Sequence, residues 1–254
     1  MAADRGGRIS QNDKASVRAP NMQGKRIKLV GHVPATDANR TPSAFRLEPA
    51  RRRIFLLSPA NASGARAKLI LGESGRSQLA ERLRGEGAPL GEVFSFISGL
   101  YFRGKLTYAR AYADPPQGLP GVLVITTSRG LVSPDKVVTL DELCDISSVP
   151  VAATESRYRI PLERDAQLLS GAIGDDCEVV LLGSIATPKY VEPLLGQFGS
   201  RLMFPAEFVG RGDMSRGGLL LRCVREGVQL RYARMAEAER QGGRPAKLTP
   251  LPRR

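Results

Sequence analysis

Residues 53–71 read RIFLLSPANASGARAKLIL, and the hydrophobic period changes in the middle of this stretch. Ile54–Leu57 is a short apolar run typical of a buried strand, whereas Ala65–Leu71 has the spacing of a helix. The polar segment Ser58–Gly64 lies between them. In an open α/β sheet, the loop that leaves the carboxyl end of a strand and enters a helix faces the ligand crevice, and its N–H groups attract anions. The stretch therefore predicts a strand, a site-forming loop and a helix.

The same order of apolar run and polar loop occurs three more times in the chain. The later runs are Val122–Ile125, Val179–Leu182 and Arg201–Phe204. If the four strands are parallel, the four loops that follow them lie at one edge of one sheet. The pattern predicts a three-layer α/β/α domain with a mainly parallel central sheet and a site at that edge.

Capping signals place several helices between these strands. Thr139 and Glu142 form a capping box, and Thr187 followed by Pro188 predicts the start of a helix that runs to Phe198. We also expect helices at 76–84, 161–173 and 215–224, an antiparallel edge strand at 228–233, and a short strand at 25–30.

The positive charge of the chain lies at its two ends. Residues 1–53 hold 12 Lys and Arg against 4 Asp and Glu, residues 240–254 hold 5 against 0, and residues 54–239 hold 21 against 21. We interpret 1–25 as a disordered basic arm, 26–239 as a single α/β domain and 240–254 as a disordered basic tail. Such arms bind phosphate, which makes DNA the expected partner, although a solubility tail has the same composition.

Cysteine, histidine and hydropathy exclude several classes of protein. The three cysteines are far apart and form no CxxC, which favours neither a disulfide framework nor a zinc site, and we expect no metal and no cofactor. The only histidine, His32, lies in the basic leader, which excludes a Ser-His-Asp triad from the body of the chain. We expect no membrane span and no secretory signal, and therefore a cytoplasmic protein.

The candidate site residues are polar or aromatic side chains in or near the four loops. Asn61 either contacts a substrate or caps the helix that follows it. The aromatic-rich segment 94–112 is either core or a stacking platform for a base. We assign substrate contacts to Ser58, Ser63, Glu92, Phe94, Lys105, Ser128, Ser184 and Ser215, and phosphate contacts to Arg66, Arg129, Lys189, Arg211 and Arg216.

The segment 210–218, GRGDMSRGG, is the most informative loop. Arg211 and Arg216 flank Asp213, which serves either as a water-orienting base or as a brace for the two arginines. Four glycines favour a site, because glycine in a purely structural turn costs backbone entropy. No GxxxxGK[ST] follows a strand and no GxGxxG opens the first helix, so nucleotide hydrolysis and NAD chemistry are disfavoured.

Residues 122–138, VLVITTSRGLVSPDKVV, resemble a segment of the YaaA-like proteins and of the domain shared with archaeosine synthase and related 7-deazaguanine enzymes. That superfamily is similar in fold to uracil-DNA glycosylases, whose first strand ends in a loop with an Asp or Asn that orients the attacking water. The resemblance implies a uracil-DNA-glycosylase-like fold, with Asn61 at the matching position. Antiphage DNA glycosylases that remove modified cytosines would also fit such a chain.

We therefore expect a DNA glycosylase that cleaves the N-glycosidic bond of a flipped, modified base, with Asn61 and Asp213 as catalytic residues. Two alternatives remain open at this stage. One is a non-catalytic DNA-binding protein, and the other is an enzyme that acts on a small phosphate-bearing nucleotide.

Overall fold

A computed structural model describes residues 51–62, 64–72, 77–238, 242–243 and 245–248 of the chain. Two units divide the chain, Met1–Arg46 and Leu47–Arg254, and every described residue lies in the second. The expected basic arm 1–25, the expected strand 25–30 and Ser63 lie outside the described residues.

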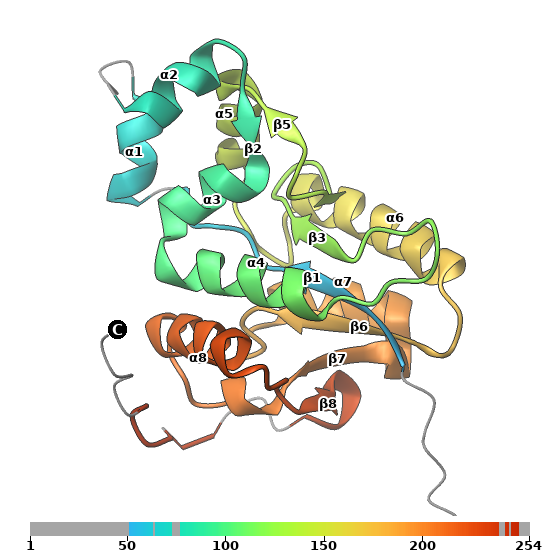
Figure 1. The fold of residues 1–254 in the computed structure, drawn as a ribbon. Coiled ribbons are helices and arrows are strands. Elements are labelled where there is room, and N and C mark those ends of the chain that lie inside the picture. The colour runs from blue at the N-terminus through green and yellow to red at the C-terminus, as the bar shows by residue number, and fades with distance from the viewer. Residues whose placement is uncertain (1–50, 63, 73–76, 239–241, 244, 249–254) are drawn as a thin grey trace, which may run out of the picture. The chain divides into compact units, whose positions relative to one another are not determined.

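A six-stranded, mainly parallel sheet forms the centre of the second unit (Figure 1). The four inner strands are parallel, as the sequence predicts, and the short outer strands β4 and β8 are antiparallel to their neighbours. In order across the sheet, the strands are β4 (Leu131–Val132), β3 (Val122–Ile125), β1 (Arg52–Leu57), β6 (Cys177–Leu182), β7 (Leu202–Pro205) and β8 (Tyr232–Arg234). A separate antiparallel pair is formed by β2 (Ala88–Pro89) and β5 (Val137–Val138).

Alternate residues of β1 enter two apolar clusters, one on each face of the sheet. Phe55 and Leu57 belong to the first cluster, and Ile54 and Leu56 to the second. Because both faces are buried at Ile54–Leu57, this part of the strand is an unbroken apolar run and does not alternate with polar residues. The first cluster includes side chains of α1 (Ala65–Leu71), α2 (Gln78–Arg84), α3 (Leu90–Ser98), α4 (Leu100–Tyr112), α5 (Leu140–Ser148) and α8 (Asp213–Glu226). The second includes side chains of α6 (Ser156–Ala172) and α7 (Pro188–Phe198).

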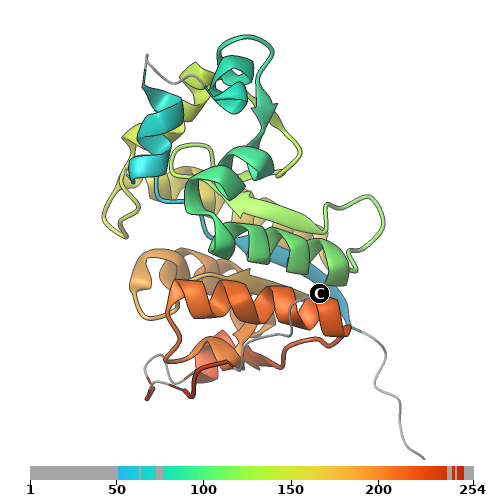
Figure 2. The same ribbon diagram turned by 60° about the vertical axis from the view of Figure 1, so that its left-hand side comes forward.

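Helices α4 and α8 lie side by side, as both ribbon views show (Figures 1 and 2). Glycine permits this close packing. A Cβ atom on Gly104 would lie 2.7 Å from the carbonyl oxygen of Gly217, and one on Gly217 would lie 2.8 Å from the carbonyl oxygen of Leu100. The contact sets the position of Asp213, the first residue of α8, relative to the side chains of α4.

Most predicted elements are confirmed, but some boundaries are wrong. Helix α8 begins at Asp213 rather than Ser215, so Gly217 and Gly218 lie inside a helix and not in a loop. Gly217 is explained by helix packing, so this glycine does not support the entropic argument for a glycine-rich site loop. Helix α6 begins at Ser156, upstream of the predicted start at Pro161, because the Glu155 carboxylate accepts a hydrogen bond from the Arg157 N–H at 3.1 Å.

Two other segments differ from the sequence-based expectation. The antiparallel edge strand is β8 at 232–234 rather than 228–233, and the aromatic-rich segment forms the two helices α3 and α4. Within the expected basic tail, Leu248 packs against the first apolar cluster, and the Arg211 guanidinium donates to the Ala246 carbonyl oxygen at 3.4 Å.

The capping box at the start of α5 forms as predicted. The Glu142 N–H donates to Thr139 Oγ1 at 3.3 Å, and the Thr139 N–H donates to the Glu142 carboxylate at 3.1 Å. Thr139→Ala is therefore expected to lower the free energy of unfolding by about 1 kcal/mol. Thr187→Ala is the matched control, because Thr187 is also an N-cap but its side chain makes no capping hydrogen bond. Urea unfolding of both variants measures the difference, and equal losses would contradict this account of the cap.

Candidate functional site

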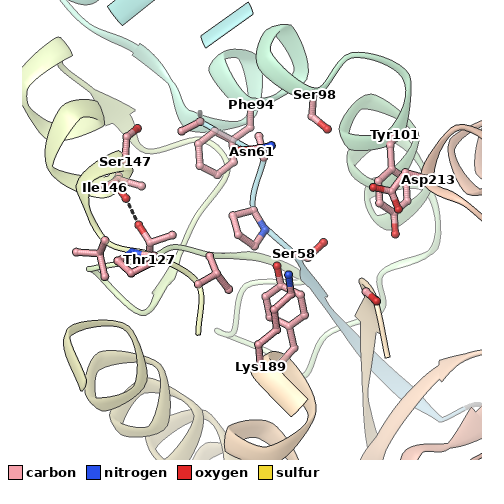
Figure 3. Close-up of a pocket in the computed structure, with 18 of the residues that line it drawn as sticks. Ser58, Asn61, Phe94, Ser98, Tyr101, Thr127, Ile146, Ser147, Lys189 and Asp213 are labelled. Carbon is pink, nitrogen blue, oxygen red and sulfur yellow. Dashed lines mark hydrogen bonds between the residues drawn. The ribbon is translucent and has the colours of Figure 1, made fainter. Parts of the chain in front are cut away.

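A cavity of about 610 Å³ opens at the carboxyl ends of the parallel strands, where the sequence places the site (Figure 3). Its walls come from the loops after β1, β3 and β6, from the end of α5 and the segment after it, and from α3, α4, α7 and α8. The volume lies within the range of small-molecule and cofactor pockets. The lining residues are Ser58, Pro59, Ala60, Asn61, Ala62, Phe94, Ser98, Tyr101, Thr127, Ile146, Ser147, Ser148, Val149, Pro150, Val151, Ser184, Lys189, Tyr190 and Asp213.

Ser58 follows the last residue of β1 and is the most deeply placed polar residue of the first loop, with 5% of its surface exposed. Lys105 of α4 lies beneath it and is 1% exposed. The Lys105 Nζ atom is 2.8 Å from Ser58 Oγ and 2.5 Å from the Ser58 carbonyl oxygen. The amine lies directly behind the serine hydroxyl, so a substrate in the cavity would meet Ser58 first.

Asn61 lies in the same loop and is exposed to the cavity (Figure 3). The residue that caps α1 is Gly64, without a side-chain hydrogen bond to the helix. Asn61 therefore does not occupy the N-cap position of α1. Its amide lies where it can contact a bound molecule.

Three aromatic residues, Phe94, Tyr101 and Tyr190, contribute to the wall. Phe94 is buried and packs edge-on against Phe102, with ring centres 5.3 Å apart. Burial raises the pKa of Tyr101 to about 12, so its hydroxyl stays protonated at neutral pH. The nearby Arg216 guanidinium acts against burial and lowers this pKa. Burial also raises the pKa of Tyr190, the other tyrosine of the wall.

Asp213 lies at the rim of the cavity as the first residue of α8, and 69% of its side chain is exposed. A carboxylate is favourable in the first turn of a helix, where backbone N–H groups point outward. The Arg216 guanidinium lies 3.6 Å from it. Arg216 is itself buried and donates to the Phe208 carbonyl oxygen at 3.0 Å, so it fixes the start of α8 rather than a bound phosphate.

The structure brings about half of the expected site residues to the cavity. Six of them line it, namely Ser58, Asn61, Phe94, Ser184, Lys189 and Asp213, and Lys105 lies beneath it. The Lys189 ammonium lies 5.2 Å from the centre of the Tyr190 ring at the start of α7.

The other expected residues have partners elsewhere or lie outside the wall. Arg129 forms ion pairs with Glu142 at 2.5 Å and Asp145 at 3.3 Å on α5. Glu92 pairs with Arg82 at 2.8 Å. Five further expected residues are described by the structure but do not line the cavity, namely Arg66, Ser128, Arg211, Ser215 and Arg216.

Several wall residues were not among the candidates. Thr127 donates from Oγ1 to the Ile146 carbonyl oxygen, which ties the loop after β3 to the end of α5 (Figure 3). The capping box predicts only where α5 starts, and the helix continues to Ser148, which brings the segment 146–151 to the wall. Thr127 could have been found, because it follows the second predicted strand.

Two further findings bear on the class of protein. Among the described residues, no group of three His, Cys, Asp or Glu side chains is placed to hold a metal ion. No helix in the described part of the chain is long and apolar enough to cross a membrane.

Comparison of the chain with protein-family models, with curated proteins and with solved structures finds no match, so a function can be inferred only from the fold and the cavity.

Proposed function

We propose that the protein is a DNA N-glycosylase that accepts a flipped, modified base in the cavity and cleaves its N-glycosidic bond. The observation that carries this proposal is a cavity of about 610 Å³ at the carboxyl edge of a parallel sheet, with aromatic walls and an exposed amide. Enzymes that act on a base must take it out of the stack, and they hold it by stacking and by hydrogen bonds to its edge. A cavity of this size has room for a base that carries a substituent.

The lining residues suit distinct roles in this reaction. Phe94 and Tyr190 provide apolar surfaces for the base. Asn61 reads the base edge or positions the attacking water, and Asp213 at the rim offsets the positive charge that develops on the sugar. Lys189 is the cation of the wall and suits a phosphate next to the flipped nucleotide.

The distribution of charge supports DNA as the substrate. The excess of basic residues lies in 1–53 and 240–254, outside a body with balanced charge. Basic arms bind the phosphate backbone without sequence preference, while the cavity would select the base. As part of this proposal, the fold is uracil-DNA-glycosylase-like, and the biological setting is defence against phage DNA with modified bases.

Incubation of the full chain with plain and base-modified phage DNA tests the proposal. We expect one type of DNA to release a free base, detected by mass spectrometry, and to acquire abasic sites, detected by cleavage in alkali. Asn61→Ala and Asp213→Asn are expected to slow release by about 100-fold, which is typical for the loss of one polar group that acts in the transition state. Glu92→Gln is the control, because Glu92 pairs with Arg82 outside the cavity.

The failed outcomes separate the alternatives. Binding of DNA without release of a base from any sample would contradict catalysis and indicate a DNA-binding protein. Neither binding nor release would favour an enzyme that acts on a small phosphate-bearing nucleotide.

A further inference from the structure

The contact between Ser58 and Lys105 has no role in base excision by Asn61 and Asp213. Ser58 Oγ lies 2.8 Å from Lys105 Nζ, within hydrogen-bond distance, and Ser58 lines the cavity. Lys105 is 1% exposed, so the amine is shielded from bulk water. A serine that touches both a cavity and a buried amine has the arrangement of an activated nucleophile.

The charge state of Lys105 depends on the groups that face it. Burial lowers the pKa of Lys105 to about 7, Asp213 of α8 raises it, and Arg216 of the same helix lowers it. On α4 the amine also faces two aromatic rings, whose centres lie 4.6 Å away for Tyr101 and 4.9 Å away for Phe102. Near neutral pH a large share of the amine is therefore uncharged, with a lone pair that can accept a proton.

We propose that Ser58 is a nucleophile activated by Lys105 as general base, and that the cavity hydrolyses a carboxylic ester or amide through an acyl-serine. This inference goes beyond base excision and does not rest on it. Lysine serves as the base for serine in several unrelated hydrolases, so a histidine is not required. The described part of the chain has no histidine, since His32 lies outside it.

The proposed reaction has two balanced steps. Ser58 Oγ forms a bond to the carbonyl carbon of the substrate, its proton moves to Lys105 Nζ, and the C–O or C–N bond to the leaving group breaks. The leaving group takes the proton from Lys105, which returns to the neutral amine. Water then attacks the acyl-serine, passes a proton through Lys105 to Ser58 Oγ, and releases the carboxylic acid. The second Lys105 contact, at 2.5 Å to the Ser58 carbonyl oxygen, holds the amine in place during both steps.

The wall of the cavity limits the class of substrate. Phe94 and Tyr190 offer apolar surfaces, and Lys189 provides a cation. The site therefore suits an acyl group attached to a flat, anionic carrier about as large as a nucleotide. p-Nitrophenyl acetate is a small flat ester probe, and a fluorophosphonate probe reports the nucleophilicity of the serine because the serine displaces fluoride from phosphorus.

The experiment treats the full chain with a fluorophosphonate probe at pH 6 to 9 and locates the adduct by peptide mass spectrometry. We expect the adduct on Ser58, with a labelling rate that rises with pH and has a midpoint near 7, where Lys105 loses its proton. Ser58→Ala should abolish the Ser58 adduct and the hydrolysis of p-nitrophenyl acetate. Lys105→Met should slow labelling at least 100-fold.

Two matched variants control for changes in fold and for general reactivity. Ser200→Ala removes an exposed serine just before β7, at the amino edge of the sheet, and Lys136→Met removes an exposed lysine that pairs with Glu142. Both should label at the wild-type rate. If Lys105→Met does not fold, the pH profile of the wild-type protein still tests the role of the amine.

The inference is overturned if the adduct forms elsewhere, if the labelling rate of folded Lys105→Met equals that of wild type, or if the wild-type rate does not change between pH 6 and 9. Release of bases from DNA, measured on the same samples, separates this inference from the proposed function. If Ser58 is labelled and no base is released, base excision is contradicted and the serine nucleophile is supported. If a base is released and Ser58 is not labelled, the serine nucleophile is contradicted and base excision is supported.

Discussion

Gly104→Ala is expected to lower the free energy of unfolding by about 2 to 3 kcal/mol, the upper part of the range for overpacked cores. The new methyl carbon would lie 2.7 Å from the carbonyl oxygen of Gly217, and this neighbour is backbone, which cannot rotate away. Helix α8 must therefore move away from α4. Since Asp213 begins α8 and Lys105 lies on α4, these two residues should move apart in the same variant.

Gly196→Ala in α7 is the control for helix propensity. A Cβ atom on Gly196 meets no atom within 4 Å, so this change should stabilise the protein by up to about 1 kcal/mol. Urea unfolding monitored by circular dichroism gives both values. A stabilised Gly104→Ala variant would show that α4 and α8 do not pack as closely as described.

The stability of the wild-type protein relative to Lys105→Met is expected to rise between pH 7 and pH 9. The pKa of Lys105 is lowered by burial from 10.5 to about 7, so the unfolded chain binds one proton more than the folded protein in this range. Stability then increases with pH by up to about 1.4 kcal/mol per pH unit. Below pH 7 the amine is protonated in both states, and its contribution no longer changes.

The measurement is urea unfolding of both proteins at pH 6, 7, 8 and 9 under reducing conditions. Methionine has a similar length and binds no proton, so the contributions of other titrating groups largely cancel in the difference. Lys136→Met, which removes an exposed lysine, should show no such rise. A constant difference between wild type and Lys105→Met would mean that the buried amine keeps an ordinary pKa.

The edge of the sheet that carries the site could be predicted from local sequence. Ile54–Leu57 and Val122–Ile125 are apolar runs of strand length, and each is followed by polar residues. Parallel strands place such loops together by geometry, which is why Ser58, Asn61 and Ser184 reach one cavity.

Local sequence could not predict the features of the site that depend on tertiary contacts. Ser58 and Lys105 are 47 residues apart, and their contact depends on how α4 packs on β1. Arg129 follows a strand as a phosphate-binding residue would, but α5 brings Glu142 and Asp145 to it. The start of α8 was missed because its N-cap is Gly212, whose lack of a side chain leaves no capping signature in the sequence.

The burial of Lys105 beneath Ser58 has a consequence for the fate of a DNA strand. An amine that cuts DNA after base loss must condense with the aldehyde of the abasic sugar to form an imine, which then eliminates the phosphate. Lys105 is enclosed and in contact with Ser58, so a sugar carbon in the cavity would meet the serine before it could form a bond to the amine. After base loss in this cavity, Lys105 would therefore not break the strand, and the abasic site would stay in a continuous strand unless Lys189 of the wall or a separate nuclease cut it.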